Sequence, residues 1–330
     1  MIKMKISATT FFVLVLTPAL AQDYQLLPAQ PGTWQNKTYE ERLTPYKLSA
    51  DEKKVLLDKT QKLCGLLKTY PEFIQPKGWE IIATTELRYL SDPSEYKPQS
   101  PLPLNLTLML AEYYRRNGKV GYSQIDEPHH EFQFTFNDPE HAFSGCSLFY
   151  EKLMDADGSE IMLEPVPVTT FGGVTLYSNS RLLITRPGKK LWIPVTGKQY
   201  FEASLRALDD KIRAGDSGAG ITRDMIKKEM ESWSAADLGK PAYVNNTGET
   251  ISGFTPEKSE FTMALVKLNP EYFDRSKPRS ATQLLSISTT LNHDFREPIE
   301  NGDPRFNDND MRVYEFLKSF DFRKLQALIE

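Results

Sequence analysis

The chain contains few of the residues that build metal centres and disulfide scaffolds. Its 330 residues include 2 cysteines and 4 histidines. This cysteine count excludes a disulfide-rich scaffold, and the two cysteines do not have the close spacing of a paired-cysteine zinc site. A strong basic excess is absent as well, because 40 Lys and Arg face 44 Asp and Glu, for a formal net charge of −4. We therefore expect no nucleic-acid partner, since binding to phosphate backbones needs a basic surface.

Long hydrophobic runs are also absent, apart from a short one near the amino terminus. Two lysines precede an apolar segment, residues 11–16, which is too short to span a bilayer. An Ala-Leu-Ala tripeptide ending at Ala21 follows it. This order is typical of a secretory signal peptide. We expect residues 1–21 to be a signal peptide that is cleaved near Ala21, and the mature protein to be secreted or periplasmic, without a membrane span.

The two cysteines, Cys64 and Cys146, would then enter an oxidising compartment, where a disulfide can form. This bridge would close a loop of about 80 residues and add roughly 4–4.5 kcal/mol of stability in the chain-entropy model. The alternative is two buried thiols, because Cys64 lies among Leu63, Leu66 and Leu67. The sequence favours neither arrangement.

The mature chain divides into an arm and a globular region. Residues 22–48 mix Pro, Gln, Asn and Thr without periodicity, which predicts an extended amino-terminal arm. A capping box at Ser49 and Glu52 then predicts a helix that ends near Lys68. We expect residues 49–330 to form an α+β globular region, which is either one domain or two domains that divide near residues 214–221.

Strands with period-two alternation dominate the first part of the globular region. Leucines at 104, 106, 108 and 110 alternate with polar residues and methionine, and Asn117-Gly118 predicts a tight turn between strands 104–115 and 119–125. Short strands with close turns indicate an antiparallel meander. Helices with apolar residues at positions such as 201, 205, 208 and 212 follow. The predicted fold class is therefore α+β, with helices packed on one face of an antiparallel sheet.

The stretch AGDSGAG, residues 214–220, contains the Gly-Asp-Ser-Gly run that surrounds the nucleophile of trypsin-like proteases. A hydrolase elbow at Ser217 would need a strand immediately before it. The preceding residues instead predict a helix, and the glycines are typical of a link between two helices. We interpret the stretch as such a link.

Three of the four histidines lie within 13 residues, in a segment rich in acids and phenylalanines. Strand alternation places His130 on the core face with the phenylalanines at 132, 134 and 136. His129 and Glu131 then lie together on the opposite face, where residues i and i+2 of a strand can bind one ion.

His141 follows a turn and could return as a third ligand. Three such ligands and a water would form a catalytic type of zinc site, with Glu127 or Glu140 as the base. The alternative is a polar hairpin without metal, because no HExxH or paired-cysteine spacing is present.

Two further segments resemble known sequences. The run RPGKKLWIPVT, residues 186–196, resembles a segment of uncharacterised secreted bacterial proteins of unknown function. The run NPEYFD, residues 269–274, with Pro278 and Gln283 beyond it, is similar to another segment of the same kind. The resemblance covers under a quarter of the chain. It implies export and a shared fold, and no activity.

Two functional hypotheses follow from these patterns. The first is an exported binding or interaction protein without catalysis or cofactor, with a glycan or a protein as ligand; Trp79, Tyr113 and Tyr114 could stack on sugars. The second is a metal-dependent hydrolase that uses zinc bound by His129, Glu131 and His141.

Overall fold

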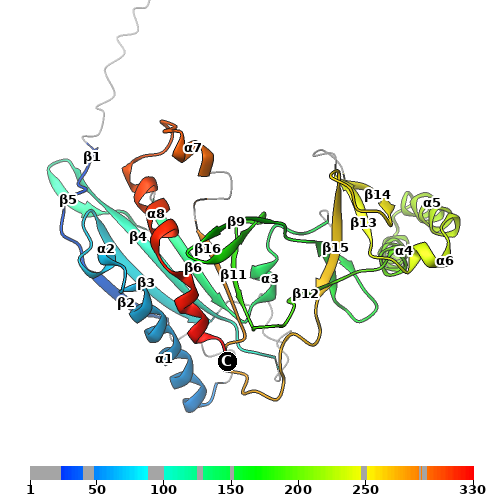
Figure 1. Cartoon of the computed structure of the whole chain (residues 1–330), viewed down its shortest axis with the longest axis horizontal. Coiled ribbons are helices and arrows are strands. Elements are labelled where there is room, and N and C mark those ends of the chain that lie inside the picture. Colours follow the sequence, from blue (N-terminus) through cyan, green and yellow to red (C-terminus); the bar gives the residue numbers. More distant parts are fainter. Residues whose placement is uncertain are drawn as a thin grey trace, which may run out of the picture.

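The computed structural model describes residues 24–39, 48–87, 100–124, 129–148, 152–246, 251–289, 291 and 296–330. They form two mostly antiparallel sheets with packed helices, which confirms the predicted α+β class (Figure 1). Within these ranges, no helix combines the length and apolar character that a membrane crossing requires. The predicted signal peptide and its cleavage site at Ala21 lie outside the described residues.

The first sheet has ten strands in the described ranges, eight of them in the order β2-β3-β4-β6-β16-β11-β10-β9, while β1 and β5 both pair with β4. Their bounds are β1 (Tyr24–Leu26), β2 (Trp34–Thr38), β3 (Trp79–Leu87), β4 (Leu104–Arg116), β5 (Lys119–Tyr122), β6 (His130–Phe136), β9 (Pro167–Phe171), β10 (Val174–Tyr177), β11 (Leu182–Thr185) and β16 (Leu284–Thr289). β16 enters between β6 and β11, so the sheet is not a single run of consecutive hairpins.

Two of these strands come from the predicted amino-terminal arm. β1 pairs with β4, and β2 runs parallel to β3. Glu80 on β3 fixes this segment, because it accepts hydrogen bonds from Thr33 N at 2.8 Å and Tyr113 Oη at 2.9 Å. Burial alone would raise the pKa of Glu80, but the hydrogen bonds from Thr33, Tyr113 and Gln35 lower it below its usual range.

One face of the first sheet is covered by helices from both ends of the chain (Figure 1). These helices are α1 (Ala50–Leu67), α2 (Pro71–Ile74), α7 (Arg296–Glu300), α8 (Asp308–Ser319) and the 3-10 helix η4 (Phe322–Leu328). α1 begins at the predicted capping box, where Glu52 Oε2 accepts from Ser49 N at 2.9 Å. Glu52 also pairs with Arg279, which ties α1 to the segment before β16.

The second sheet has the order β14-β13-β15-β8-β7, with β12 also paired to β15. Its strands are β7 (Leu153–Met154), β8 (Glu160–Leu163), β12 (Trp192–Pro194), β13 (Tyr243–Asn246), β14 (Ile251–Thr255) and β15 (Thr262–Leu268). Helices α4 (Gly197–Arg213), α5 (Ala219–Ser232) and α6 (Ala235–Leu238) belong to this part of the chain, and α4 packs on one face of the sheet. The AGDSGAG stretch links α4 to α5, and Ser217 is exposed there.

A separate apolar cluster joins the two sheets, and we name it the junction layer. It consists of Ala142, Phe143, Cys146, Met162, Leu183, Leu191, Val266, Tyr272 and Leu284, all buried. These residues come from the short helix α3 (Pro139–Ala142) and the loop after it, from both sheets, and from two further loops. The second sheet therefore packs α4 against one face and the junction layer against the other.

Both cysteines are free, buried thiols in the structure. Cys64 lies in the core between α1 and the first sheet, whereas Cys146 lies in the junction layer. Burial raises the pKa of Cys64 to about 11 and the pKa of Cys146 to about 12. Of the two arrangements that the sequence allowed, a disulfide or two buried thiols, the structure has the buried thiols.

The close approach of the β9–β10 turn to the carboxyl-terminal segment predicts a large effect of Gly172→Ala. Gly172 has a φ of +50°, and a Cβ there would lie 1.8 Å from the carbonyl oxygen of Phe320. Gly118 has a φ of +74° with open space around it. We expect Gly118→Ala to cost about 1–2 kcal/mol through backbone strain alone, and Gly172→Ala to cost clearly more. Urea unfolding of both variants measures the difference, and equal losses would contradict the contact.

The Glu52–Arg279 pair predicts part of the acid sensitivity of the fold. The Arg279 hydrogen bond lowers the pKa of Glu52 to about 2, from an ordinary 4.5. A lowered folded-state pKa stabilises the fold above pH 4.5, and this contribution is lost as the pH falls towards 2. Glu52→Gln should therefore flatten the pH dependence of the unfolding midpoint in that window. Asp58→Asn, at an exposed position of α1, is the matched control; an identical flattening in both variants would argue against the pair.

Candidate functional site

The histidine-rich segment places His130 inside the core. His130 is buried on β6, with its Nε2 atom 3.6 Å from Glu112 Oε1 and 3.6 Å from Asp310 Oδ1. Desolvation lowers the pKa of His130, and burial raises the pKa of Glu112 despite a hydrogen bond from Asn309. This cluster joins β4 and β6 to the first turn of α8 and is a structural contact.

His129 and Glu131 lie next to each other, as strand alternation predicts. His129 Nε2 is 3.6 Å from Glu131 Oε2, and Gln133 Nε2 donates to Glu131 Oε1 at 2.6 Å. His129 therefore lies beside Glu131, and Glu131 lies beside Gln133, on the sheet face opposite the helices.

His141 lies apart from this pair, on α3. Its Nδ1 atom is 2.6 Å from Ser286 Oγ and its Nε2 atom is 3.2 Å from Ser288 Oγ. Ser288 pairs in register with Gln133, four residues along β6 from His129. Four residues of strand span about 13 Å of backbone, so the two histidines belong to separate positions along the sheet.

The structure does not bring the three predicted ligands together. In the described parts of the chain, no group of three or more His, Cys, Asp or Glu residues could hold a metal ion. Glu127, one of the two predicted bases, lies outside the described residues, and Glu140 lines a cavity beside α3.

Trp79 and Tyr113, two of the three aromatic residues proposed to stack on sugars, make contacts within the fold. Trp79 is 1% exposed, and the Arg312 guanidinium carbon lies 3.7 Å from its ring centroid. Tyr113 packs edge-on against Tyr122 at 5.7 Å and donates to Glu80. A ligand cannot reach the buried Trp79 ring.

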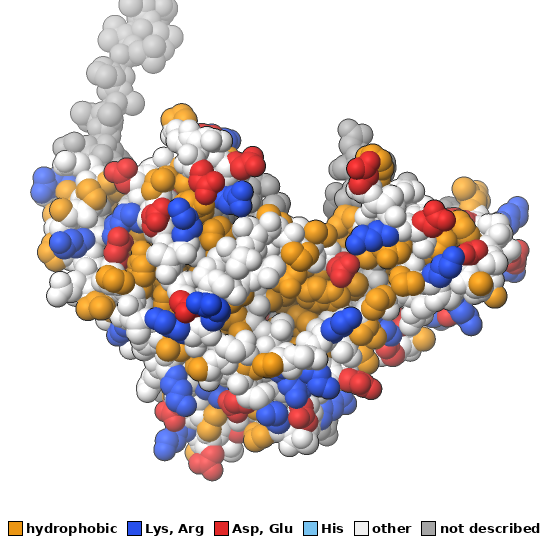
Figure 2. Space-filling model, in the orientation of Figure 1, with side chains coloured by type: hydrophobic (Ala, Val, Ile, Leu, Met, Phe, Trp, Pro, Cys, Tyr) orange, Lys and Arg blue, Asp and Glu red, His pale blue; other side chains and the backbone are white. Residues whose placement is uncertain are grey.

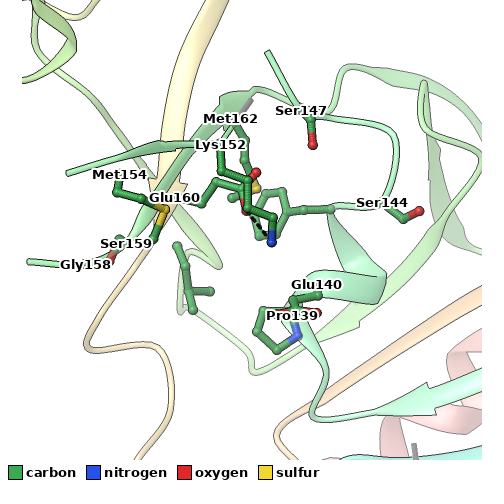
Figure 3. A pocket seen from close by; sticks show the side chains of 12 residues that line it. Pro139, Glu140, Ser144, Ser147, Lys152, Met154, Gly158, Ser159, Glu160 and Met162 are labelled. Carbon is green, nitrogen blue, oxygen red and sulfur yellow. Dashed lines mark ion pairs between the residues drawn. The ribbon is translucent and has the colours of Figure 1, made fainter. Parts of the chain in front are cut away.

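Two cavities flank the junction layer, and the first lies beside α3 (Figure 3). It has a volume of about 380 Å³, and Phe143 and Met162 of the junction layer form part of its wall. Lys152 Nζ and Glu160 Oε2 are 3.4 Å apart, and the dashed line in Figure 3 marks this pair. The lining also includes Glu140, so this cavity has two carboxylates and one ammonium group, and two of these three charges form the Lys152–Glu160 pair.

The second cavity, the junction groove, has a volume of about 400 Å³. Its lining comes from both sheets and from the loop before β12: Glu164, Tyr177, Thr185, Lys189, Lys190, Leu191, Trp192, Pro194, Pro241, Tyr243, Ala264 and Val266. Figure 2 shows hydrophobic side chains gathered in the hollow between β9 and β15. Cavities of a few hundred Å³ between packed units, with aromatic walls and few polar groups, are typical of ligand sites.

Three contacts hold the Trp192 side chain in the lining of the junction groove. Its ring centroid lies 5.6 Å from that of Tyr177 and 5.7 Å from that of Phe143, both edge-on. Its Nε1 atom donates to Glu164 Oε1 at 3.0 Å, which orients this carboxylate in the groove lining. Burial, and then the charge of Glu164, raise the pKa of Tyr177, so its hydroxyl stays protonated and can donate.

Comparisons with known proteins add no relative to this description: no protein-family model, no curated protein and no solved structure matches the chain. The resemblance of residues 186–196 and 269–274 to uncharacterised secreted bacterial proteins therefore stays a prediction.

Sequence reasoning missed the junction groove because its walls come from distant segments. Lys189, Lys190 and Trp192 lie in the run RPGKKLWIPVT, which the sequence did single out. Glu164 and Tyr243 lie on other strands of the second sheet or next to them, and only the tertiary structure places them beside that run.

The serine contacts of His141 predict that it stabilises the fold and is not a metal ligand. His141→Ala removes one hydrogen-bond partner from the buried Ser286 and one from the half-buried Ser288, and it should cost about 1–3 kcal/mol. His129→Ala, at a half-buried position, should cost less than about 1 kcal/mol. Thermal unfolding with EDTA and with zinc should show the same metal response in wild type and both variants. A zinc-dependent rise in the wild-type midpoint that disappears in both variants would restore the shared metal site.

Proposed function

We propose that this chain is an exported binding protein without catalysis, and that it holds a glycan in the junction groove. Export is inferred from the predicted signal peptide, residues 1–21. The observation that supports binding is the junction groove itself. There the Trp192 ring packs against Phe143 and Tyr177, and its N–H orients the carboxylate of Glu164.

The chemistry of the lining favours a sugar over a purely apolar ligand. Sugar rings present C–H faces that pack on aromatic rings, and hydroxyls that donate to carboxylates. Trp192, Tyr177 and Tyr243 supply the aromatic surface, and Glu164 supplies a charged acceptor. A fixed groove also lowers the conformational cost of binding, because its side chains are ordered before the ligand arrives.

The metal-dependent hydrolase is the weaker proposal. It requires His129, Glu131 and His141 to share one zinc ion, and the register of β6 with β16 gives this arrangement no support. A glycan can bind in the junction groove without any of these residues.

Tyr243→Ala should weaken glycan binding at least about tenfold, because truncation of an aromatic contact at a binding site commonly costs more than 1 kcal/mol. Binding of the purified secreted protein is measured against an array of neutral and acidic oligosaccharides, then by calorimetry with the tightest-binding sugar. Tyr122→Ala, a partly buried tyrosine on β5, is the control and should leave binding unchanged.

Tryptophan fluorescence gives a second readout of the same site. The sugar should change the emission of the wild-type protein, and Trp192→Phe should remove most of that change. No binding to any oligosaccharide of the array would refute the proposal, and equal losses in Tyr243→Ala and Tyr122→Ala would place the site elsewhere.

A further inference from the structure

Two lysines line the junction groove from one short loop. Lys189 and Lys190 precede β12, and both are exposed. The loop is a tight turn, in which Lys189 N donates to Arg186 O at 3.2 Å and Gly188 has a φ of +70°. Asn269 then fixes its far end, because its Nδ2 atom donates to Lys190 O at 2.9 Å. The backbone that carries the two ammonium groups is therefore held against the second sheet.

Neither lysine has an ion-pair partner among the described residues, whereas the neighbouring arginine does. Arg186 donates to Tyr272 O at 2.7 Å, and its Nη2 atom lies 3.5 Å from Asp274 Oδ2. Arg186 is therefore used within the fold, whereas the ammonium groups of Lys189 and Lys190 remain available to a ligand. An exposed ammonium group is a strongly hydrated point charge that pairs readily with anions.

The charges of the groove lining are unequal. Lys189 and Lys190 are its two cations, and Glu164 is its single anion. Glu164 already accepts the Trp192 N–H, so part of its charge is satisfied within the groove. A ligand that complements this lining needs hydroxyl donors for Glu164, an apolar ring face for the aromatic residues, and an anionic group for the lysines.

We propose that the junction groove selects an acidic saccharide, whose carboxylate or sulfate group pairs with Lys189 and Lys190. This inference rests on the proposed glycan-binding function and adds the charge of the ligand to it. The ring lies against the aromatic lining, its hydroxyls donate to Glu164, and the acid group reaches the loop before β12.

The test compares matched sugars that differ in charge. Oligogalacturonate and its methyl-esterified form have the same ring and differ in the carboxylate, and sulfated heparin fragments test the other anion. Cello- and chito-oligosaccharides are the neutral arm. We expect the tightest acidic sugar to bind at least about tenfold better than its neutral counterpart at low salt, and this preference to shrink as salt rises.

The double variant Lys189→Ala, Lys190→Ala should lose the preference for acidic sugars and keep the weaker binding of neutral ones. Lys119→Ala, Lys258→Ala is the matched control, because it removes two exposed lysines outside the groove lining and should bind like wild type. Circular dichroism of each variant checks that the fold is intact.

Each remaining outcome separates the two proposals. Equal binding of neutral and acidic sugars would overturn the acidic preference and leave the glycan-binding function standing. A preference that falls equally in both double variants reflects overall charge and overturns the role of the loop. Binding of no sugar at all would overturn both proposals.

Discussion

The packing of the junction layer is the contact on which the rest of the structure depends. The second sheet needs cover on both faces, since α4 fills only one of them. Met162 and Val266 supply its other face and meet Leu183 and Leu284 of the first sheet. Each fully buried side chain of this size contributes about 1.5–3 kcal/mol. The layer therefore fixes how the sheets meet, and the two cavities lie where it ends.

A buried charge makes the register of this packing specific. Along β15, Val266 points to the junction layer, while Leu265 and Lys267 point to the α4 side. Lys267 Nζ lies 2.6 Å from Asp155 Oδ2 and 2.6 Å from Asp157 Oδ2. A slip of one residue would turn Lys267 into the apolar layer and leave the buried Asp155 with its longer contact to Arg206, at 3.8 Å, as the remaining cationic contact. The ion pair thus opposes the alternative register more than it adds stability to the native one.

Local sequence patterns predicted several strands, turns and helix starts. Long-range strand pairing, which these patterns do not reveal, determines which residues meet at the candidate site. The alternation of Phe132 and its neighbours, the Asn117-Gly118 turn and the capping box at Ser49 are visible in the sequence because each depends on residues a few positions apart. The insertion of β16 beside β6 depends on no such pattern. His141 shows the consequence: its nearness in sequence to His129 suggested a shared metal, but its ring nitrogens contact serines that lie about 145 positions later.

Trp192 connects the groove to the junction layer, so the proposed ligand binding would be coupled to the packing of the two sheets. Its ring contacts Phe143 of the layer and Tyr177 of the first sheet, and its N–H holds Glu164 of the second sheet. A ligand seated against Trp192 and Glu164 binds only the arrangement in which both sheets are docked. By mass action such a ligand stabilises that arrangement by RT ln(1 + [L]/Kd). If the groove binds the proposed glycan, its affinity depends on the docking of the two sheets, and a change that loosens the layer would weaken this binding without altering a residue that contacts the ligand.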